Sequence, residues 1–184
     1  MTLRTVIILA FLLGSVGCDD DSPAGSEYNG TYELISHQES ATCETPEWTD
    51  VEITDPYFRL HAESFFGTPI IAWNECTGNT DDTCDDSIDL MSTFTRIDGQ
   101  WVQYMATSSF NGESICLVTL RRGILEETDT GVIWNVTTKT GTLTVETEEE
   151  CDPDLAQSRE DELECSDLER YEASLQQPQI EPLQ

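Results

Sequence analysis

Basic residues are scarce in this chain. Its 184 residues include 8 Lys and Arg against 37 Asp and Glu, which gives a formal net charge of −29. Lys139 is the only lysine, and Arg121 and Arg122 form the only adjacent basic pair. Because nucleic acids and polybasic membrane contacts both require clustered Lys and Arg side chains, the composition argues against these two kinds of partner. The mutual repulsion of so many acidic groups favours a monomer.

Catalytic and metal-binding motifs are equally scarce. The two histidines, His37 and His61, fall opposite the apolar face of their predicted strands, so we expect both to be exposed. The chain has no Gly-x-Ser-x-Gly elbow, no glycine-rich phosphate loop and no Cys-x-x-Cys pair. The acidic run 79–86 lacks the spacing of an EF-hand and is expected to be a solvated loop. We therefore predict a non-catalytic protein that uses no metal and no cofactor.

The longest apolar run is too short to cross a bilayer. It occupies 5–16, follows a leader that contains Arg4, and ends in small residues before Cys18 and three aspartates. A transmembrane helix needs about 20 apolar residues, whereas a run of this length is typical of a signal peptide.

Small residues that lead to a single cysteine, followed by an abrupt polar switch, resemble the lipobox of bacterial lipoproteins. This chain has Ser15 three residues before Cys18, where the family usually has leucine. The resemblance implies a signal peptide over 1–17, lipidation of Cys18 and an acidic flexible tether over 18–28. The protein would then be exported and anchored to the inner or outer membrane, facing the periplasm or the cell surface. An ordinary secretory signal cleaved elsewhere, or a signal anchor, is the alternative.

The number of cysteines fits this interpretation. If one of the seven carries lipid, six remain for three disulfides, which persist in oxidising compartments. Six cysteines allow 15 connectivities, and the sequence does not choose among them. The pairing that we favour joins Cys76 to Cys84 and Cys151 to Cys165 as local staples, with a long-range bond from Cys43 to Cys116.

Apolar and polar residues alternate with a period of two from residue 30 onward, which predicts half-buried strands. Asp98 and Gly99 are typical of a two-residue hairpin turn. Further turns are indicated at 111–112, 128–131 and 140–141. We expect eight or nine antiparallel strands over 29–150, joined as an up-and-down meander. Such a meander forms a closed barrel or a sandwich, and short sequential hairpins favour the barrel.

The character of the sequence changes after the predicted strands. Asp152 followed by Pro153 fits the start of a helix. Leucines and a tyrosine at imperfect helical spacing then continue to Leu175. We therefore expect an all-β fold that ends in a C-terminal helical segment over 151–176, followed by a disordered tail over 177–184.

This layout is similar to that of lipocalins and of small cysteine-containing envelope lipoproteins of Gram-negative bacteria. The lipocalin family carries Gly-x-Trp in its first strand, where this chain has Gly30 and Tyr32. The resemblance implies a barrel whose interior encloses a small apolar ligand. The candidate lining residues are Tyr32, Leu34, Phe94, Trp101 and Trp134.

Besides a passive structural role in the envelope, two binding functions are open at this point. One is binding of a small apolar ligand inside the barrel, and the other is docking of a protein partner through exposed aromatic residues such as Trp48 or Phe110. The volume of the interior separates them. A cavity lined by the candidate residues favours the ligand, whereas a filled core with an exposed apolar patch favours the partner.

Overall fold

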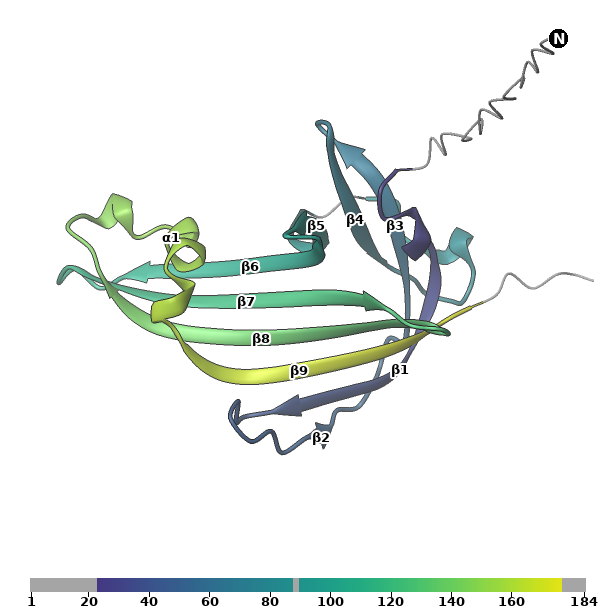
Figure 1. The fold of residues 1–184 in the computed structure, drawn as a ribbon, viewed down its shortest axis with the longest axis horizontal. Helices are drawn as coiled ribbons and strands as arrows, with labels where there is room; N and C mark the ends of the chain where they lie inside the picture. Colours follow the sequence, from purple (N-terminus) through teal and green to yellow (C-terminus); the bar gives the residue numbers. More distant parts are fainter. Residues whose placement is uncertain (1–22, 88–89, 177–184) are drawn as a thin grey trace, which may run out of the picture.

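β-Strands make up most of the computed structural model, which describes residues 23–87 and 90–176 (Figure 1). The predicted signal peptide, Cys18, the first part of the tether and the predicted tail lie outside the described residues. No helix within the described residues is both long enough and apolar enough to cross a membrane. The strands are β1 (Gly30–Ser40), β2 (Thr49–Asp50), β3 (Tyr57–Phe65), β4 (Thr68–Glu75), β5 (Thr93–Ile97), β6 (Gln100–Phe110), β7 (Ile115–Glu127), β8 (Gly131–Thr144) and β9 (Glu164–Leu175).

Eight of these strands form a closed antiparallel barrel. Each pairs with the next in the order β1, β3, β4, β5, β6, β7, β8, β9, and β9 pairs back with β1. The short β2 adds to the end of β1 outside this ring. The predicted up-and-down β-barrel is therefore confirmed. Short turns explain the pairing of β3 with β4, β5 with β6, β6 with β7 and β7 with β8, because such loops join adjacent antiparallel strands. Longer segments join β1 to β3, β4 to β5 and β8 to β9.

Two of the hairpins have the backbone geometry of a type I′ turn. Asp98 and Gly99 have φ values of 50° and 85°, as predicted for this turn, and Phe66 and Gly67 have φ values of 49° and 83°. Asp and Gly tolerate the left-handed region, but a bulky residue such as Phe does so only at a cost. Phe66 is also 95% exposed and contacts only Phe65 edge-on among aromatic rings of the described residues, at a centroid distance of 4.6 Å, so packing offsets little of this cost.

Replacement of Phe66 by asparagine is therefore expected to stabilise the protein by roughly 0.5–1 kcal/mol, because asparagine adopts positive φ more readily. Urea unfolding monitored by circular dichroism measures the change. Asp98→Asn, at the corresponding position of the other hairpin, serves as the control and should change stability little. Equal or lower stability of Phe66→Asn would show that the tip is not strained.

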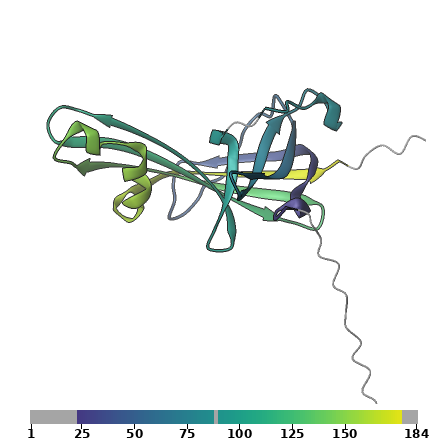
Figure 2. The same cartoon turned by 90° about the horizontal axis from the view of Figure 1, so that it is seen from above.

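Two hydrophobic cores stabilise the fold. The first fills the barrel, and its largest fully buried side chains include Phe94, Leu60 and Ile71. The second lies where β6, β7 and β8 extend beyond the barrel, as the long strands in Figures 1 and 2 show. There the short helix α1 (Pro153–Ser158) covers one face of the sheet, and its Ala156 is fully buried. Single-turn 3-10 helices, η4 (Glu148–Glu150) and η5 (Glu160–Glu162), flank α1.

The prediction of a helical segment over 151–176 is wrong for most of its length. The helix that begins at Asp152 and Pro153 is confirmed, with the Asp152 carboxylate accepting a hydrogen bond from the Leu155 amide at 2.9 Å. It ends at Ser158, and β9 then closes the barrel between β8 and β1. Strand pairing on both sides satisfies the backbone hydrogen bonds of this segment, which outweighs its weak helical spacing.

The turn predicted at 140–141 is also wrong, because β8 continues without a break from Gly131 to Thr144. Gly141 pairs with Val118 in the middle of the sheet. A Cβ atom at Gly141 would lie 2.7 Å from Cδ2 of Leu163, which packs in the second core. The glycine is therefore needed for close packing, not for a turn.

Three disulfides link the six remaining cysteines. The bond Cys76–Cys84 is confirmed, whereas the other two favoured pairings are wrong: Cys43 bonds Cys165, and Cys116 bonds Cys151. Because residue 165 lies in β9 beside β1, it comes close to Cys43 and not to Cys151. Three disulfides indicate an oxidising compartment outside the cytoplasm.

Candidate functional site

The interior of the barrel is filled by its own side chains. All five predicted ligand-lining residues belong to the first core or pack against it, so their inward orientation is confirmed. The space that remains among the surrounding side chains is only about 10 Å³. Small-molecule sites usually measure roughly 300–1,000 Å³. A ligand inside the closed barrel, as the resemblance to lipocalins implied, would have no room without rearrangement of this core.

Aromatic rings account for much of this filling. A continuous row of rings crosses the barrel, each in contact with the next at a centroid separation between 4.2 and 5.4 Å; in order these are Tyr32, Phe58, Trp73, Trp134, Tyr171 and His37. Such contacts stabilise a core beyond simple burial. Trp73 and Trp134, in the middle of this row, are only partly buried and lie towards one end of the barrel.

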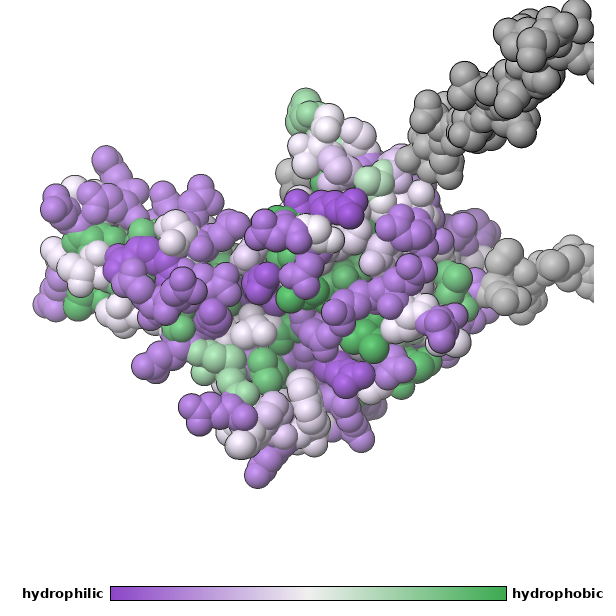
Figure 3. All heavy atoms as spheres, viewed as in Figure 1, coloured by the Kyte–Doolittle hydropathy of each residue, from purple (hydrophilic) through white to green (hydrophobic). Residues whose placement is uncertain are grey.

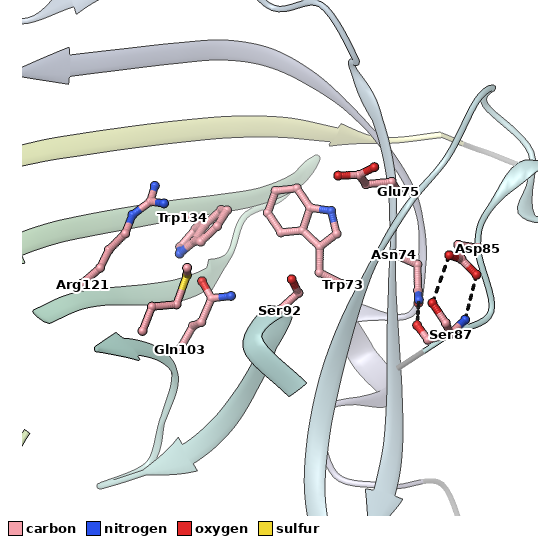
Figure 4. Close-up of a pocket in the computed structure, with 10 residues that line it drawn as sticks. Trp73, Asn74, Glu75, Asp85, Ser87, Ser92, Gln103, Arg121 and Trp134 are labelled. Carbon is pink, nitrogen blue, oxygen red and sulfur yellow. Dashed lines mark hydrogen bonds between the residues drawn. The ribbon is translucent and has the colours of Figure 1, made fainter. Parts of the chain in front are cut away.

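A cleft of about 440 Å³ opens at this end of the barrel (Figure 4). We call it the mouth cleft. Trp73 and Glu75 of β4 form one wall of the cleft. Arg121 of β7 and Trp134 of β8 form the facing wall, and Gln103 of β6 lies between the two walls. The two indole rings meet at 65° with centroids 4.7 Å apart, so they form an apolar corner. An apolar surface with a few converging polar groups is the usual composition of a small-molecule site.

Trp134 reaches this position because Gly123 on the neighbouring strand has no side chain. A Cβ atom at Gly123 would lie 2.1 Å from the Nε1 atom of Trp134. The indole therefore lies directly over the backbone of β7. Tyr171 of β9 stacks on the ring at a centroid distance of 4.8 Å and an interplanar angle of 25°. These contacts fix the orientation of the indole.

Arg121 is held by β9 on the same wall. Its Nη2 donates to both carboxylate oxygens of Glu169 at 2.9 Å and to the Tyr171 hydroxyl at 3.1 Å. The Tyr171 hydroxyl in turn donates to Glu169. Burial, and then this hydrogen bond, raise the pKa of Tyr171 far above its usual value, so the phenol stays neutral. Glu169 therefore neutralises the charge of Arg121 and fixes its guanidinium group in the wall.

Two donor atoms of residues that line the mouth cleft are themselves buried, and they lack a hydrogen-bond partner among the described residues. They are Nε of Arg121 and Nε1 of Trp134. Figure 4 shows the indole nitrogen on the ring edge that faces Arg121 and Gln103. On the opposite wall, no hydrogen bond or ion pair within the described part of the chain involves the Glu75 carboxylate. Most buried polar groups in proteins are paired, so the two unpaired donors are unusual. Glu75 is exposed, so water satisfies its carboxylate.

The far rim of the cleft is fixed by a short loop. The disulfide Cys76–Cys84 closes this loop, and the Asn74 side chain donates to the Ser87 carbonyl at 2.7 Å. The Ser87 amide and hydroxyl donate to the Asp85 carboxylate at 2.9 and 3.0 Å, which lowers the pKa of Asp85. The rim is therefore preorganised by covalent and hydrogen bonds.

The two histidines differ from each other. His61 is exposed, as predicted, but the prediction for His37 is wrong because its side chain is only 18% exposed. It stacks on Tyr171, and its Nε2 atom lies 3.4 Å from a Glu169 oxygen. In residues 23–87 and 90–176, no three His, Cys, Asp or Glu side chains gather in a way that could hold a metal ion.

The aromatic residues considered for partner docking also differ. Trp48 is 42% exposed, as expected, whereas Phe110 packs against the second core and is not a free surface group. Figure 3 shows hydrophobic residues in small groups between hydrophilic ones on the face in view. The exposed apolar side chains come from separate elements: Ile35, Trp48, Phe66, Met91, Leu117 and Leu175. A single large apolar patch, the expected mark of a partner site, is not formed by these scattered residues.

Sequence reasoning found Trp134 but missed the other wall residues. Trp73 was hidden in a nearly continuous apolar run, and Glu169 and Tyr171 fell in the segment predicted to be helical. Arg121 was noticed only as half of a basic pair. The available signal for this site was an arginine, Arg121, in a predicted strand two residues before Gly123, so that both lie on the same inward face. In comparisons with protein-family models, curated proteins and solved structures, nothing matched this chain.

Proposed function

We propose that this protein is an exported, lipid-anchored envelope protein that binds a small ligand without transforming it. One observation carries the binding part of the proposal. The barrel interior is full, with about 10 Å³ of free space, whereas the mouth cleft offers about 440 Å³ beside two partly buried indoles. We therefore place the proposed ligand site in the mouth cleft and not in the barrel interior, where the sequence suggested it. The anchoring part depends on Cys18 and its lipobox-like context.

Native mass spectrometry of the full-length protein tests both parts. The chain is exported with its own leader, purified from membranes in mild detergent and mixed with a small-molecule extract of the cell envelope. We expect a chain that begins at Cys18, carries acyl groups and lacks six hydrogens, with an additional non-covalent adduct. An unacylated chain with a different N-terminus would overturn the anchoring part.

Matched variants localise the adduct. Met105→Trp is expected to abolish it, because Met105 lines the mouth cleft and a larger side chain there fills the open space. Leu117→Trp is the control, since Leu117 is 51% exposed on β7 and does not line the mouth cleft. An adduct that survives Met105→Trp, or no adduct with the unmodified protein, would overturn the binding part.

A further inference from the structure

β6 has an unpaired edge along most of its length. On one side it pairs with β7 from Trp101 to Phe110 without a register shift. On the other side β5 pairs only with Gln100, Trp101 and Val102. Figure 1 shows β6 as the uppermost of the long strands that extend to the left. The edge of β6 beyond Val102 therefore has no strand partner among the described residues.

The register shows which backbone groups this edge presents. Ile97 and Gln100 flank a two-residue hairpin turn, so they exchange both hydrogen bonds, and in antiparallel pairs this arrangement repeats at every second residue. The Asn111 amide donates across the β7 hairpin at 3.0 Å, as this alternation requires. The amides and carbonyls of Ala106 and Ser108 therefore point away from β7. In the part of the chain that the structure describes, no hydrogen bond reaches these backbone groups.

This edge lacks the features that usually prevent the addition of another strand. Natural edge strands carry charged side chains, proline or a bulge, or they are covered. Residues 103–110 contain no charged residue and no proline, and their pairing with β7 has no bulge. α1 packs on one face of β6 through Ala156, and its backbone hydrogen bonds are not made to this edge. Such an edge can accept the backbone of another extended chain.

An acidic segment, 148–162, lies beside this edge. The Ser108 hydroxyl donates to the Cys151 carbonyl at 3.1 Å, and the Tyr104 hydroxyl donates to Glu160 at 3.4 Å. Nearby cations are already engaged, since Lys139 pairs with Glu160, Arg159 pairs with Glu162, and Arg122 lies over the Tyr104 ring. The other acidic side chains of the segment form no ion pair with a described residue; they are Glu148, Glu149, Glu150, Asp152, Asp154 and Asp161.

We propose that β6 accepts an extended, basic segment of a partner protein as an additional strand. The backbone of this segment pairs with Ala106 and Ser108, and its Lys or Arg side chains lie beside the acidic segment 148–162. The net charge of −29 opposes the addition of a second copy of this chain at the same edge. The surface does not require a ligand in the mouth cleft, so the inference goes beyond the proposed function.

Amide hydrogen exchange of the full-length protein in mild detergent, followed by ¹⁵N NMR, tests the state of the edge. In the free protein we expect the Ala106 and Ser108 amides to exchange at least about 10-fold faster than those of Met105 and Thr107, which bond to β7. Equal protection of all four amides would show that the edge is already covered by this chain or by a second copy, and would overturn the proposal.

The probe is a blocked eight-residue peptide of alternating Lys and Val. Binding of this peptide should slow the exchange of the Ala106 and Ser108 amides about 10-fold or more and leave Met105 and Thr107 unchanged. No slowing at millimolar peptide would overturn the inference. The small ligand of the mouth cleft is tested separately by its own adduct, so either proposal can fail alone.

Two further peptides separate strand addition from simple attraction of charge. The first is the same peptide with every backbone nitrogen methylated, which keeps the charge but has no backbone donors. The second alternates Glu and Val, which keeps the donors but reverses the charge. We expect each to bind at least about 10-fold more weakly than the Lys–Val peptide. Full affinity of the methylated peptide would overturn strand addition, and full affinity of the Glu–Val peptide would overturn the basic partner.

Matched variants of the protein locate the bound strand. Thr107→Lys places a positive charge on the exposed part of β6 and is expected to weaken binding of the Lys–Val peptide roughly 3- to 10-fold. Thr142→Lys is the control, because Thr142 is also exposed but lies on β8, two strands from the edge, and its effect should be smaller. Equal effects of the two variants, or full affinity in Thr107→Lys, would overturn the assignment of the site to β6.

Discussion

Replacement of Cys43 and Cys165 by serine is expected to lower the free energy of unfolding by about 4–5 kcal/mol. The two residues are 122 positions apart, so the bond removes more freedom from the unfolded chain than a short-range bond does. It also joins the end of β1 to β9, the pair that closes the barrel. Urea unfolding of the double variant and of the unmodified protein, both under oxidising conditions, measures the difference.

The matched control is the double variant Cys76→Ser and Cys84→Ser. This disulfide spans only 8 positions, so its loss is expected to cost less, about 2–3 kcal/mol. Loss of this disulfide should instead alter the structure of the mouth cleft, because the bond closes the loop at the rim of the cleft. A larger loss of stability from the short-range bond than from the long-range bond would contradict the assigned pairing of the barrel seam.

Truncation of Phe94 to alanine is expected to destabilise the protein by about 3–5 kcal/mol, because the side chain is fully buried among other core residues. It contacts Trp134 edge-on with a centroid distance of 5.6 Å. Its removal should leave an apolar cavity in the barrel interior. Apolar cavities of this kind stay dry and can take up benzene. The variant should therefore acquire the interior apolar site that the filled barrel does not offer.

Urea unfolding with and without benzene measures both effects, since a ligand that binds only the folded state raises its stability. Leu117→Ala is the control, because Leu117 is 51% exposed and its truncation should change stability little. If Phe94→Ala does not fold, Phe94→Leu gives a smaller loss in the same direction. A loss below 1 kcal/mol in Phe94→Ala would show that the interior is less tightly packed than the structure indicates.

Local signals predicted the strands of the barrel well. The turn at Asp98 and Gly99 was recognisable because few dipeptides adopt two consecutive positive φ values. The apparent turn at 140–141 contained a glycine for a different reason, which is the close approach of Leu163 to β8. From sequence alone, a glycine that allows a turn and one that allows close packing look the same.

The closing strand could not be recognised for a physical reason. An inward-facing strand normally shows apolar residues at every second position, but the inward positions of β9 include Glu169. This carboxylate is compatible with partial burial because Arg121 donates to it and His37 lies beside it. Both partners are distant in sequence and come close only when the barrel closes. The alternation was therefore hidden by an ion pair that exists only in the folded state.

The same reason explains how far the candidate site could be predicted. Trp134 and Phe94 were identified as inward-facing from alternation, which is a local property. The position of Trp134 Nε1 depends on Gly123 and Tyr171, and the neutralisation of the Arg121 charge depends on Glu169. Such properties depend on which strands become neighbours. They could be determined only after the register of the whole sheet was known.

The seam between β1 and β9 also restricts when the barrel can close during folding. Because the first and last barrel strands pair with each other, the ring cannot close until residue 175 has been synthesised and delivered to the folding compartment. Contacts so distant in sequence form slowly. The meander of β6, β7 and β8 can assemble earlier, because its strands are neighbours in the sequence. The incomplete barrel would then expose its row of aromatic rings to proteases and to other chains, and this vulnerable interval would end only when β9 docks.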